Sequence, residues 1–252
     1  MIKGLYSAVS ALVMNTAKQQ LLSHNIANMD TPGFKQVLVD ATTFMQDQQV
    51  YSQETSSGQN PSYLGLLGLG TQVADEYVDL SQGTLDNTGN QLDFALQGNG
   101  FFTVKTPDGT RYTRDGRFIR DAKNNLVTVD GYQVLDDTGK AITLPDGDVS
   151  VASDGAITVA GKAVAKLGIG EFAKPETELK RTEGNLFTGP AASTGKDVPQ
   201  VVQGAIETSN ADPARMMTQL SEVARSYEAA QKLVQNQDEL LGKAIQYLGH
   251  SG

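Results

Sequence analysis

A heptad pattern near the C-terminal end places the strongest constraint on the fold of this 252-residue chain. Apolar or small residues follow two adjacent lines, Leu220, Tyr227, Val234, Leu241 and Leu248 on one and Met216, Val223, Ala230 and Ala244 on the other. A period of 3.5 residues is typical of a helix that packs lengthwise against another helix. Asp212 and Pro213 suit the start of this helix, and Gly249 suits its end. The helix would extend for about 54 Å, so a second helix must cover its apolar seam.

The N-terminal segment, residues 3–28, offers that second helix. Apolar residues stand in the same heptad register at Leu5, Val9, Leu12 and Ile26. The middle of the line is polar, so an ordinary amphipathic helix explains the pattern as well as a packing seam does. The helix must end before Pro32, because a residue that precedes proline avoids the α region. The apolar start resembles a short signal peptide, but no cleavage site follows it, and we expect a helix that is retained.

The middle of the chain changes character twice. Residues 34–70 are polar and then glycine-rich, show no clear period, and predict an extended arm or linker. Residues 71–200 contain short β-type runs, with Asp-Gly pairs that begin at Asp108, Asp115, Asp130, Asp146 and Asp154. Asp-Gly pairs favour tight hairpins, because both residues tolerate positive φ. Residues 71–200 therefore predict a small antiparallel β domain.

The predicted fold class is α+β, in which long N- and C-terminal helices form a coiled-coil core layer and a small antiparallel β domain is inserted between them. Along the chain, we expect an N-terminal helix of the core layer at 1–33 and an extended arm or linker at 34–70. A β domain with its connecting segments follows at 71–200, and the C-terminal helix of the core layer at 201–252.

Composition and residue spacing argue against several classes of function. The net charge of −9 opposes binding to nucleic acid, and the chain has no run of about 18 apolar residues for membrane insertion. Cysteine is absent, and His24 and His250 lack the spacing of a zinc site. The Asp-Gly pairs lack the ligand spacing of a calcium loop, so hairpin turns are the preferred explanation. We expect no metal site, no cofactor, no small-molecule substrate and no catalytic residue, and therefore a protein that is not an enzyme.

Two further features each allow two interpretations. Arginine recurs every third residue at Arg111, Arg114, Arg117 and Arg120, which predicts a solvated, salt-bridged face or, alternatively, a contact between subunits. Gly242 lies inside the predicted C-terminal helix, where glycine costs about 1 kcal/mol relative to alanine. The helix either tolerates this glycine or uses it to let another helix approach closely.

Several short blocks resemble, in order, motifs of the bacterial flagellar basal-body rod proteins of the FlgF/FlgG type, which include Gram-positive FlhO/FlhP-like members. The blocks are LSHNIANMDTPGFK at 22–35, LDFALQGNGFF at 92–102, YTRDGRF at 112–118, QGAIETSN at 203–210 and RSYE at 225–228. The residues that carry the match are Asn25, Ala27, Asn28, Thr31, Gly33, Phe34, Lys35, Gly98, Gly100, Phe101, Asp115, Gly116, Ser209, Asn210, Tyr227 and Glu228. A proximal-rod, a distal-rod and an FlhO/FlhP-like member all remain open.

The resemblance implies a structural subunit of the flagellar rod, which polymerises helically into the drive shaft that transmits torque from motor to hook. It also implies export through the flagellar type III apparatus, to the periplasm or cell-wall zone outside the cytoplasmic membrane. The implied partners are further copies of the chain, other rod and hook proteins, and the export apparatus.

The two terminal helices are then expected to form the assembly interface. Its predicted residues are Leu5, Val9, Leu12, Ile26, Met216, Leu220, Val223, Tyr227, Val234, Leu241 and Leu248. The alternatives are another extracellular coiled-coil fibre or adhesin-like assembly protein with a β head, and a β-domain hydrolase.

Overall fold

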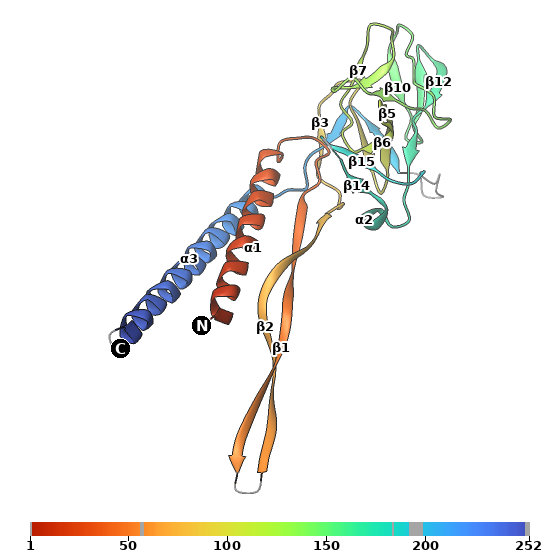
Figure 1. Cartoon of the computed structure of the whole chain (residues 1–252). Helices are drawn as coiled ribbons and strands as arrows, with labels where there is room; N and C mark the ends of the chain where they lie inside the picture. The colour runs from red at the N-terminus through yellow and green to blue at the C-terminus, as the bar shows by residue number, and fades with distance from the viewer. Residues whose placement is uncertain (1, 56–57, 183, 192–198, 250–252) are drawn as a thin grey trace. The chain divides into compact units, whose positions relative to one another are not determined.

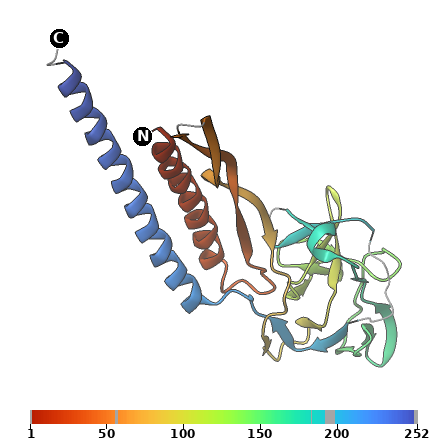
Figure 2. The ribbon, with the colours of Figure 1, turned by 90° about the horizontal axis from the view of Figure 1, so that it is seen from below.

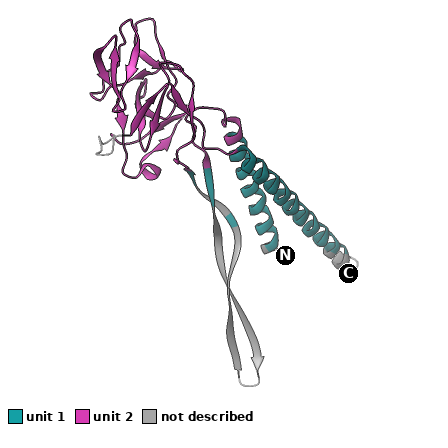
Figure 3. Cartoon of the chain, turned by 180° about the vertical axis from the view of Figure 1, so that it is seen from behind, with its two compact units in different colours: residues 1–24, 38–77, 213–252 teal, residues 25–37, 78–212 magenta. Residues whose placement is uncertain are grey.

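The computed structural model describes residues 2–55, 58–182, 184–191 and 199–249 (Figure 1). Contacts divide the chain into two compact units (Figure 3). Unit 1 contains residues 1–24, 38–77 and 213–252, and unit 2 contains residues 25–37 and 78–212. Both ends of the chain therefore belong to the same unit, and the four-segment division along the sequence stays a prediction.

Unit 1 is built from two long helices and two long strands. Its elements are α1 (Ile2–Ala27, whose last turn belongs to unit 2), β1 (Val37–Thr55), β2 (Gly58–Val78) and α3 (Pro213–Gly249). The strands β1 and β2 pair with each other in a two-stranded sheet. The helices α1 and α3 lie side by side and run in opposite directions (Figures 1 and 2). The Asn15 side-chain amide of α1 donates a hydrogen bond of 3.0 Å to the Ser226 hydroxyl of α3.

The predicted coiled-coil core layer is wrong. The two helices face each other across a groove of about 440 Å³, lined by Gly4, Ser7, Ala8 and Ala11 of α1 and by Ser226, Ala229, Ala230, Leu233 and Gln237 of α3. A coiled-coil seam requires large apolar side chains that interlock, whereas this lining is mostly small. The heptad pattern indicated two helices correctly, but small residues face each other where the prediction needed large ones.

The predicted small β insertion is wrong as well, because most of the described chain outside α1 and α3 is β. Unit 2 contains β3 (Leu85–Asn87), β4 (Phe94–Gln97), β5 (Phe101–Thr106), β6 (Gly109–Thr113), β7 (Phe118–Arg120), β8 (Leu126–Thr128), β9 (Gln133–Val134), β10 (Val149–Val151), β11 (Ala156–Val159), β12 (Lys162–Lys166) and β13 (Ile169–Gly170). It continues with the short helix α2 (Pro175–Glu178), β14 (Lys180–Arg181), β15 (Leu186–Thr188), β16 (Gln200–Gln203) and β17 (Ala205–Glu207).

These strands form four antiparallel sheets. The largest has eight strands in the order β14-β15-β6-β5-β9-β8-β7, with β13 paired to β5 off this path. The others are β10-β11-β12, β16-β4 and β17-β3. The predicted Asp-Gly turns are confirmed at Asp108, Asp130 and Asp154, which lie between the paired strands β5 and β6, β8 and β9, and β10 and β11, respectively.

The core of unit 2 follows the alternation of β5. Successive side chains of a strand point to opposite faces of its sheet. Phe102 and Val104 belong to the larger buried cluster, where the Phe102 ring lies 5.2 Å from Phe118. Phe101 belongs to a second cluster on the other side, where its ring lies 5.4 Å from Phe187. Strand β5 is therefore covered on both faces.

Candidate assembly surface and buried motif cluster

The predicted interface residues differ widely in exposure. Met216 is buried; Leu5, Leu12, Leu220, Val223 and Val234 are half-buried; Val9, Tyr227 and Leu241 are exposed. Ile26 is half-buried and belongs to unit 2, so the structure does not group it with the others. The side chain of Leu248 lies outside the described residues.

Large exposed apolar side chains concentrate on the two helices of unit 1. They include Tyr6 and Val13 of α1, and Leu233, Leu240 and Ile245 of α3. Clustered exposed apolar residues mark surfaces that contact other proteins. The heptad pattern did not predict these residues, because they lie outside the one line on α1 and the two lines on α3.

The face of α3 that meets α1 continues past the start of α1. A side-chain atom placed on Gly4, near the start of α1, would lie 3.7 Å from the Gln237 amide of α3. At 100° per residue, Leu240 and Leu241 continue the same face of α3 beyond that point. They are 52% and 36% exposed, and Figure 2 shows α3 extending past α1. This apolar end of α3, residues 240–245, is the candidate assembly surface.

In unit 2, residues from distant motif blocks meet at a buried charged cluster, which we define as Lys35, Arg114 and Glu207. The Lys35 ammonium donates a hydrogen bond to the Glu207 carboxylate, and the Arg114 guanidinium donates another of 3.0 Å. The side chains of Lys35 and Glu207 are fully buried, and that of Arg114 is 3% exposed. The solvated face predicted for the arginines is therefore wrong for Arg114. Arg114 and Glu207 were not predicted as site residues, although each lies inside a matching block.

The other described arginines of that run lie nearer the surface. Arg117 makes a two-pronged contact with the Asp115 carboxylate, at 3.1 and 2.7 Å. Arg120 pairs with the exposed Asp146 at 3.2 Å. The regular spacing of the arginines did not predict which of them is buried. Strand β6 ends at Thr113, so the later arginines do not follow the alternation of that strand.

Burial controls the electrostatics of the charged cluster. Desolvation lowers the pKa of Lys35 from its ordinary value, although the nearby Glu207 carboxylate acts in the opposite direction. Burial likewise lowers the pKa of Arg114 against the effect of Glu207. Burial acts to raise the pKa of Asp79, but hydrogen bonds from Gln36 and Ser81 outweigh it and hold that pKa below its ordinary value. Within the charged cluster, the Glu207 carboxylate thus balances both buried cations, Lys35 and Arg114.

Two motif glycines allow close backbone contacts around this cluster. Gly33 has φ of 68°, and its N–H donates a hydrogen bond of 2.6 Å to the Glu207 carbonyl. A methyl group on Gly33 would overlap the peptide between Arg114 and Asp115. A methyl group on Gly116 would overlap the Phe94 carbonyl. Larger residues at either position would separate backbone segments that now touch.

Two motif asparagines fasten the segment between α1 and β1. The Asn25 side chain donates to the Val37 carbonyl at 2.7 Å and accepts from the Val37 N–H at 3.0 Å. The Asn210 side chain accepts from the Gln36 N–H at 2.9 Å and donates to the Asp79 carbonyl at 2.8 Å. An amide suits both places, because one side chain supplies a donor and an acceptor.

Aromatic and glycine residues of the motifs contact arginines or lie close to a neighbouring segment. The Arg181 guanidinium lies 4.6 Å from the ring centre of the buried Phe34, and that of Arg114 lies 5.1 Å from the ring centre of Phe101. The Gly98 carbonyl accepts a hydrogen bond of 2.7 Å from Arg114. Gly100 is buried, so close to Pro199 that a methyl group on it would lie 2.6 Å from the proline ring.

The remaining motif residues shape turns or lie elsewhere. The carbonyls of Asn28 and Thr31 accept hydrogen bonds in successive turns after α1, and the Ser209 hydroxyl accepts one of 3.1 Å from the Ala211 N–H. Ala27 is exposed. Tyr227 and Glu228 are exposed on α3, which belongs to unit 1.

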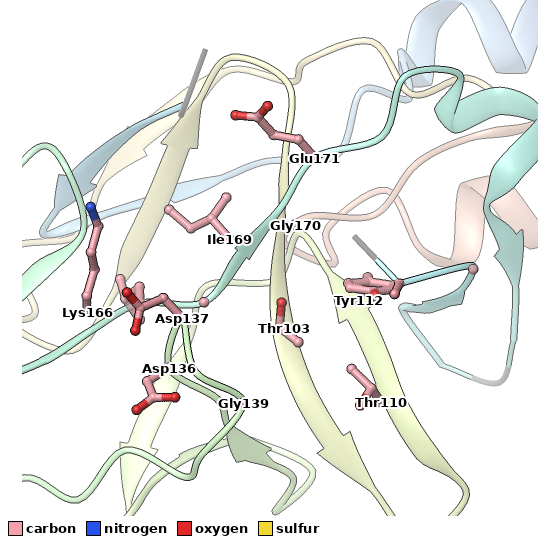
Figure 4. Close-up of a pocket in the computed structure, with 14 residues that line it drawn as sticks. Thr103, Thr110, Tyr112, Asp136, Asp137, Gly139, Lys166, Ile169, Gly170 and Glu171 are labelled. Atoms are coloured by element: carbon pink, nitrogen blue, oxygen red, sulfur yellow. The ribbon is translucent and has the colours of Figure 1, made fainter. Parts of the chain in front are cut away.

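Unit 2 also contains a hollow of about 460 Å³. Asp136, Asp137 and Lys166 lie on one side of it and Tyr112 on the other (Figure 4). The Asp136 carboxylate accepts hydrogen bonds from the N–H groups of Thr138 and Lys140, at 2.9 and 2.7 Å, and so closes its own turn.

Among the described residues, no group of three or more His, Cys, Asp or Glu side chains could hold a metal ion. None of the described helices combines the length and apolar character needed to span a bilayer.

Comparison with known proteins gives three family matches along the chain. Residues 5–35 match the flagella basal body rod protein family, residues 95–159 the D1 domain of the flagellar hook protein FlgE/F/G family, and residues 202–247 the C-terminal domain of the flagellar basal body rod FlgEFG proteins. These ranges contain Lys35, Arg114 and Glu207, respectively.

Curated relatives align over almost their full length. The chain is 33% identical to the flagellar basal-body rod protein FlgF of Caulobacter vibrioides, with 99% of each chain covered. It is 32% identical to FlgF of Rhizobium meliloti, with 98% of each chain covered. It is also 32% identical to the flagellar basal-body rod protein FlgG of Bacillus subtilis, with 97% of this chain and 98% of the relative covered. The chain therefore belongs to the flagellar basal-body rod protein family, and it is a structural subunit of the flagellar basal body, outside the cytoplasm.

Proposed function

We propose that the chain polymerises helically with further copies of itself and with other rod and hook proteins, and that the polymer transmits torque from motor to hook. Its role is mechanical, and it is not an enzyme. The observation that carries this proposal is the apolar end of α3, where Leu240, Leu241 and Ile245 are exposed on a helix that continues beyond its partner. In a helical polymer, the same contact repeats from subunit to subunit without closing into a ring.

The predicted interface residues on α1 and α3 belong to this proposal as well. Full burial of a leucine contributes about 1.5–3 kcal/mol relative to full exposure. Leu240 and Leu241, which are partly exposed, would each contribute on the order of 1 kcal/mol when a neighbour covers them. The contribution per residue is modest, but every subunit of the polymer would add it again.

We also propose that the flagellar export apparatus delivers the chain unfolded to the periplasm or cell-wall zone. The absence of cysteine supports this route, because no disulfide could lock a fold before export.

Substitution of the apolar end of α3 tests the assembly proposal. Leu240→Asp and Leu241→Asp are made together in a strain that lacks the wild-type chain. Both side chains are exposed and belong to unit 1. Unit 2 should therefore unfold at the wild-type temperature, as measured by circular dichroism. Inside a contact, the two carboxylates would be buried without partners, at a cost of several kcal/mol. We expect loss of swimming and absence of the chain from isolated basal bodies.

The matched control places the same charges on the opposite face of α3. Gln235 and Gln246 are exposed, and at 100° per residue they lie on the other side of the helix from Leu240 and Leu241. The Gln235→Asp and Gln246→Asp variant should assemble and swim. If the leucine variant also assembled normally, the apolar end of α3 would not be an assembly surface.

A further inference from the structure

The segment 200–211 completes unit 2 from the far end of its sequence. Strand β16 pairs with β4, so that Val201 lies opposite Leu96, and β17 pairs with β3. Val201 is part of the larger buried cluster. The partners β3 and β4 precede this segment by more than a hundred residues, so the two sheets form only when the late segment docks.

The Glu207 side chain joins this late segment to three earlier ones. One carboxylate oxygen accepts hydrogen bonds from the Lys35 ammonium and, at 2.9 Å, from the Gly83 N–H. The other oxygen accepts from Arg114 at 3.0 Å. The Glu207 carbonyl accepts from the Gly33 N–H. The contacts therefore tie the residues beside Lys35, Gly83 and Arg114 to one late residue.

The folded state of unit 2 requires the contact of Glu207 with Lys35 and Arg114, because both cations are buried. Without Glu207, neither Arg114 nor Lys35 would have an ion-pair partner among the described residues; Lys35 would keep its hydrogen bond of 2.6 Å to the Ser81 carbonyl and the through-space effect of Asp79. The penalty for unpaired buried ions is of the same order as the whole stability of a typical domain. An early fold that buried Lys35 and Arg114 before Glu207 arrived would therefore be unstable.

We infer that residues 200–211 are a closing segment, and that unit 2 reaches its folded state only when Glu207 docks between Lys35 and Arg114. Docking of Glu207 is therefore a step that the folding of the whole unit requires. The amides of the core strands β5 and β6 become stably protected from hydrogen exchange together with those of β16 and β17. One consequence rests on the proposed export. A chain delivered from its N-terminus would keep unit 2 unfolded until the closing segment had emerged.

Amide hydrogen exchange of the full-length chain tests this inference without any flagellar component. Glu207→Gln keeps the shape of the side chain and removes its charge. We expect the amides of β5 and β6 and those of β16 and β17 to exchange faster by the same factor, at least about a hundredfold. The control is Glu228→Gln, an exposed position on α3, which should leave exchange in unit 2 unchanged.

Refolding of the wild-type chain gives a second measurement, which does not require the variant to fold. In pulsed exchange labelling, β5 and β6 should become protected in the same kinetic phase as β16 and β17. The inference is overturned if β5 and β6 are protected in an earlier phase. It is equally overturned if the Glu207→Gln variant loses protection only at residues 199–211 and 33–37. Neither outcome affects the assembly proposal, which is tested in isolated basal bodies.

Discussion

The Asn25 side chain can be tested by replacement with alanine and with aspartate. Asn25 is 2% exposed and Val37 is 8% exposed, and the two hydrogen bonds between them measure 2.7 and 3.0 Å. Alanine would leave the buried N–H and carbonyl of Val37 without these partners. Each unsatisfied buried group costs about 1–3 kcal/mol, so the free energy of unfolding should fall by about 2–6 kcal/mol. That loss is a large share of the stability of a typical domain.

The aspartate variant separates the two hydrogen bonds. Asn25→Asp keeps an acceptor for the Val37 N–H but places a carboxylate against the Val37 carbonyl. The introduced carboxyl should therefore have a higher pKa in the folded chain than in the unfolded chain. The folded state then binds more protons, so stability should increase as the pH falls through this pKa. The protonated carboxyl can donate to the carbonyl and should recover part of the lost stability.

Urea unfolding followed by circular dichroism measures both effects, because the chain has no tryptophan to report by fluorescence. Asn99→Ala is the matched control, since Asn99 is exposed in the turn before β5, and it should change stability by less than about 0.5 kcal/mol. The reasoning would be refuted if Asn25→Ala were as stable as this control. It would also fail if Asn25→Asp lost stability on acidification from neutral pH faster than the wild type.

Three further predictions concern charge and helix propensity. Glu207→Gln should destabilise unit 2 more than Lys35→Met in urea unfolding, because Glu207 pairs with two buried cations and loss of a partner from a buried ion pair costs about 3–5 kcal/mol. Equal losses of stability in the two variants would contradict the shared pairing of Glu207. Gly242→Ala meets open space and should stabilise α3 by about 1 kcal/mol; impaired incorporation into basal bodies would instead show that another helix approaches this position. The pKa of Asp79 is lowered in the folded chain, so its contribution is present above its ordinary pKa of 3.8 and is lost as the pH falls toward the folded value. Asp79→Asn should flatten stability against pH in that acidic window, and an unchanged acid profile would argue against this assignment.

Local patterns predicted the local elements well. The heptad lines and the Pro213 signal predicted α3, and the break before Pro32 agrees with the end of α1 at Ala27. Three of the predicted Asp-Gly turns join paired strands. The motif blocks predicted the family. These signals succeed because helix ends, turns and motif residues depend on a few neighbours along the chain.

The packing of the elements was less predictable. Residues 34–70 lack a clear period, so the sequence predicted an arm or linker there but did not predict that β1 and β2 pair with each other. The heptad lines predicted interlocked helices, whereas the groove between α1 and α3 is lined largely by small residues such as Gly4 and Ala230. Pairing of strands and contact between helices depend on segments far apart in the chain, and periodicity within one segment does not report them.

The sequence by itself determined where the terminal helices lie, where three of the turns between paired strands occur, and to which family the chain belongs. Only the tertiary structure decided that Arg114 is buried while Arg117 and Arg120 reach the surface, and that Glu207 balances both Arg114 and Lys35. The physical reason is that a charge can be buried only beside its partner. These partners are separated by 93 and 172 positions in the sequence, so their meeting is a property of the folded chain.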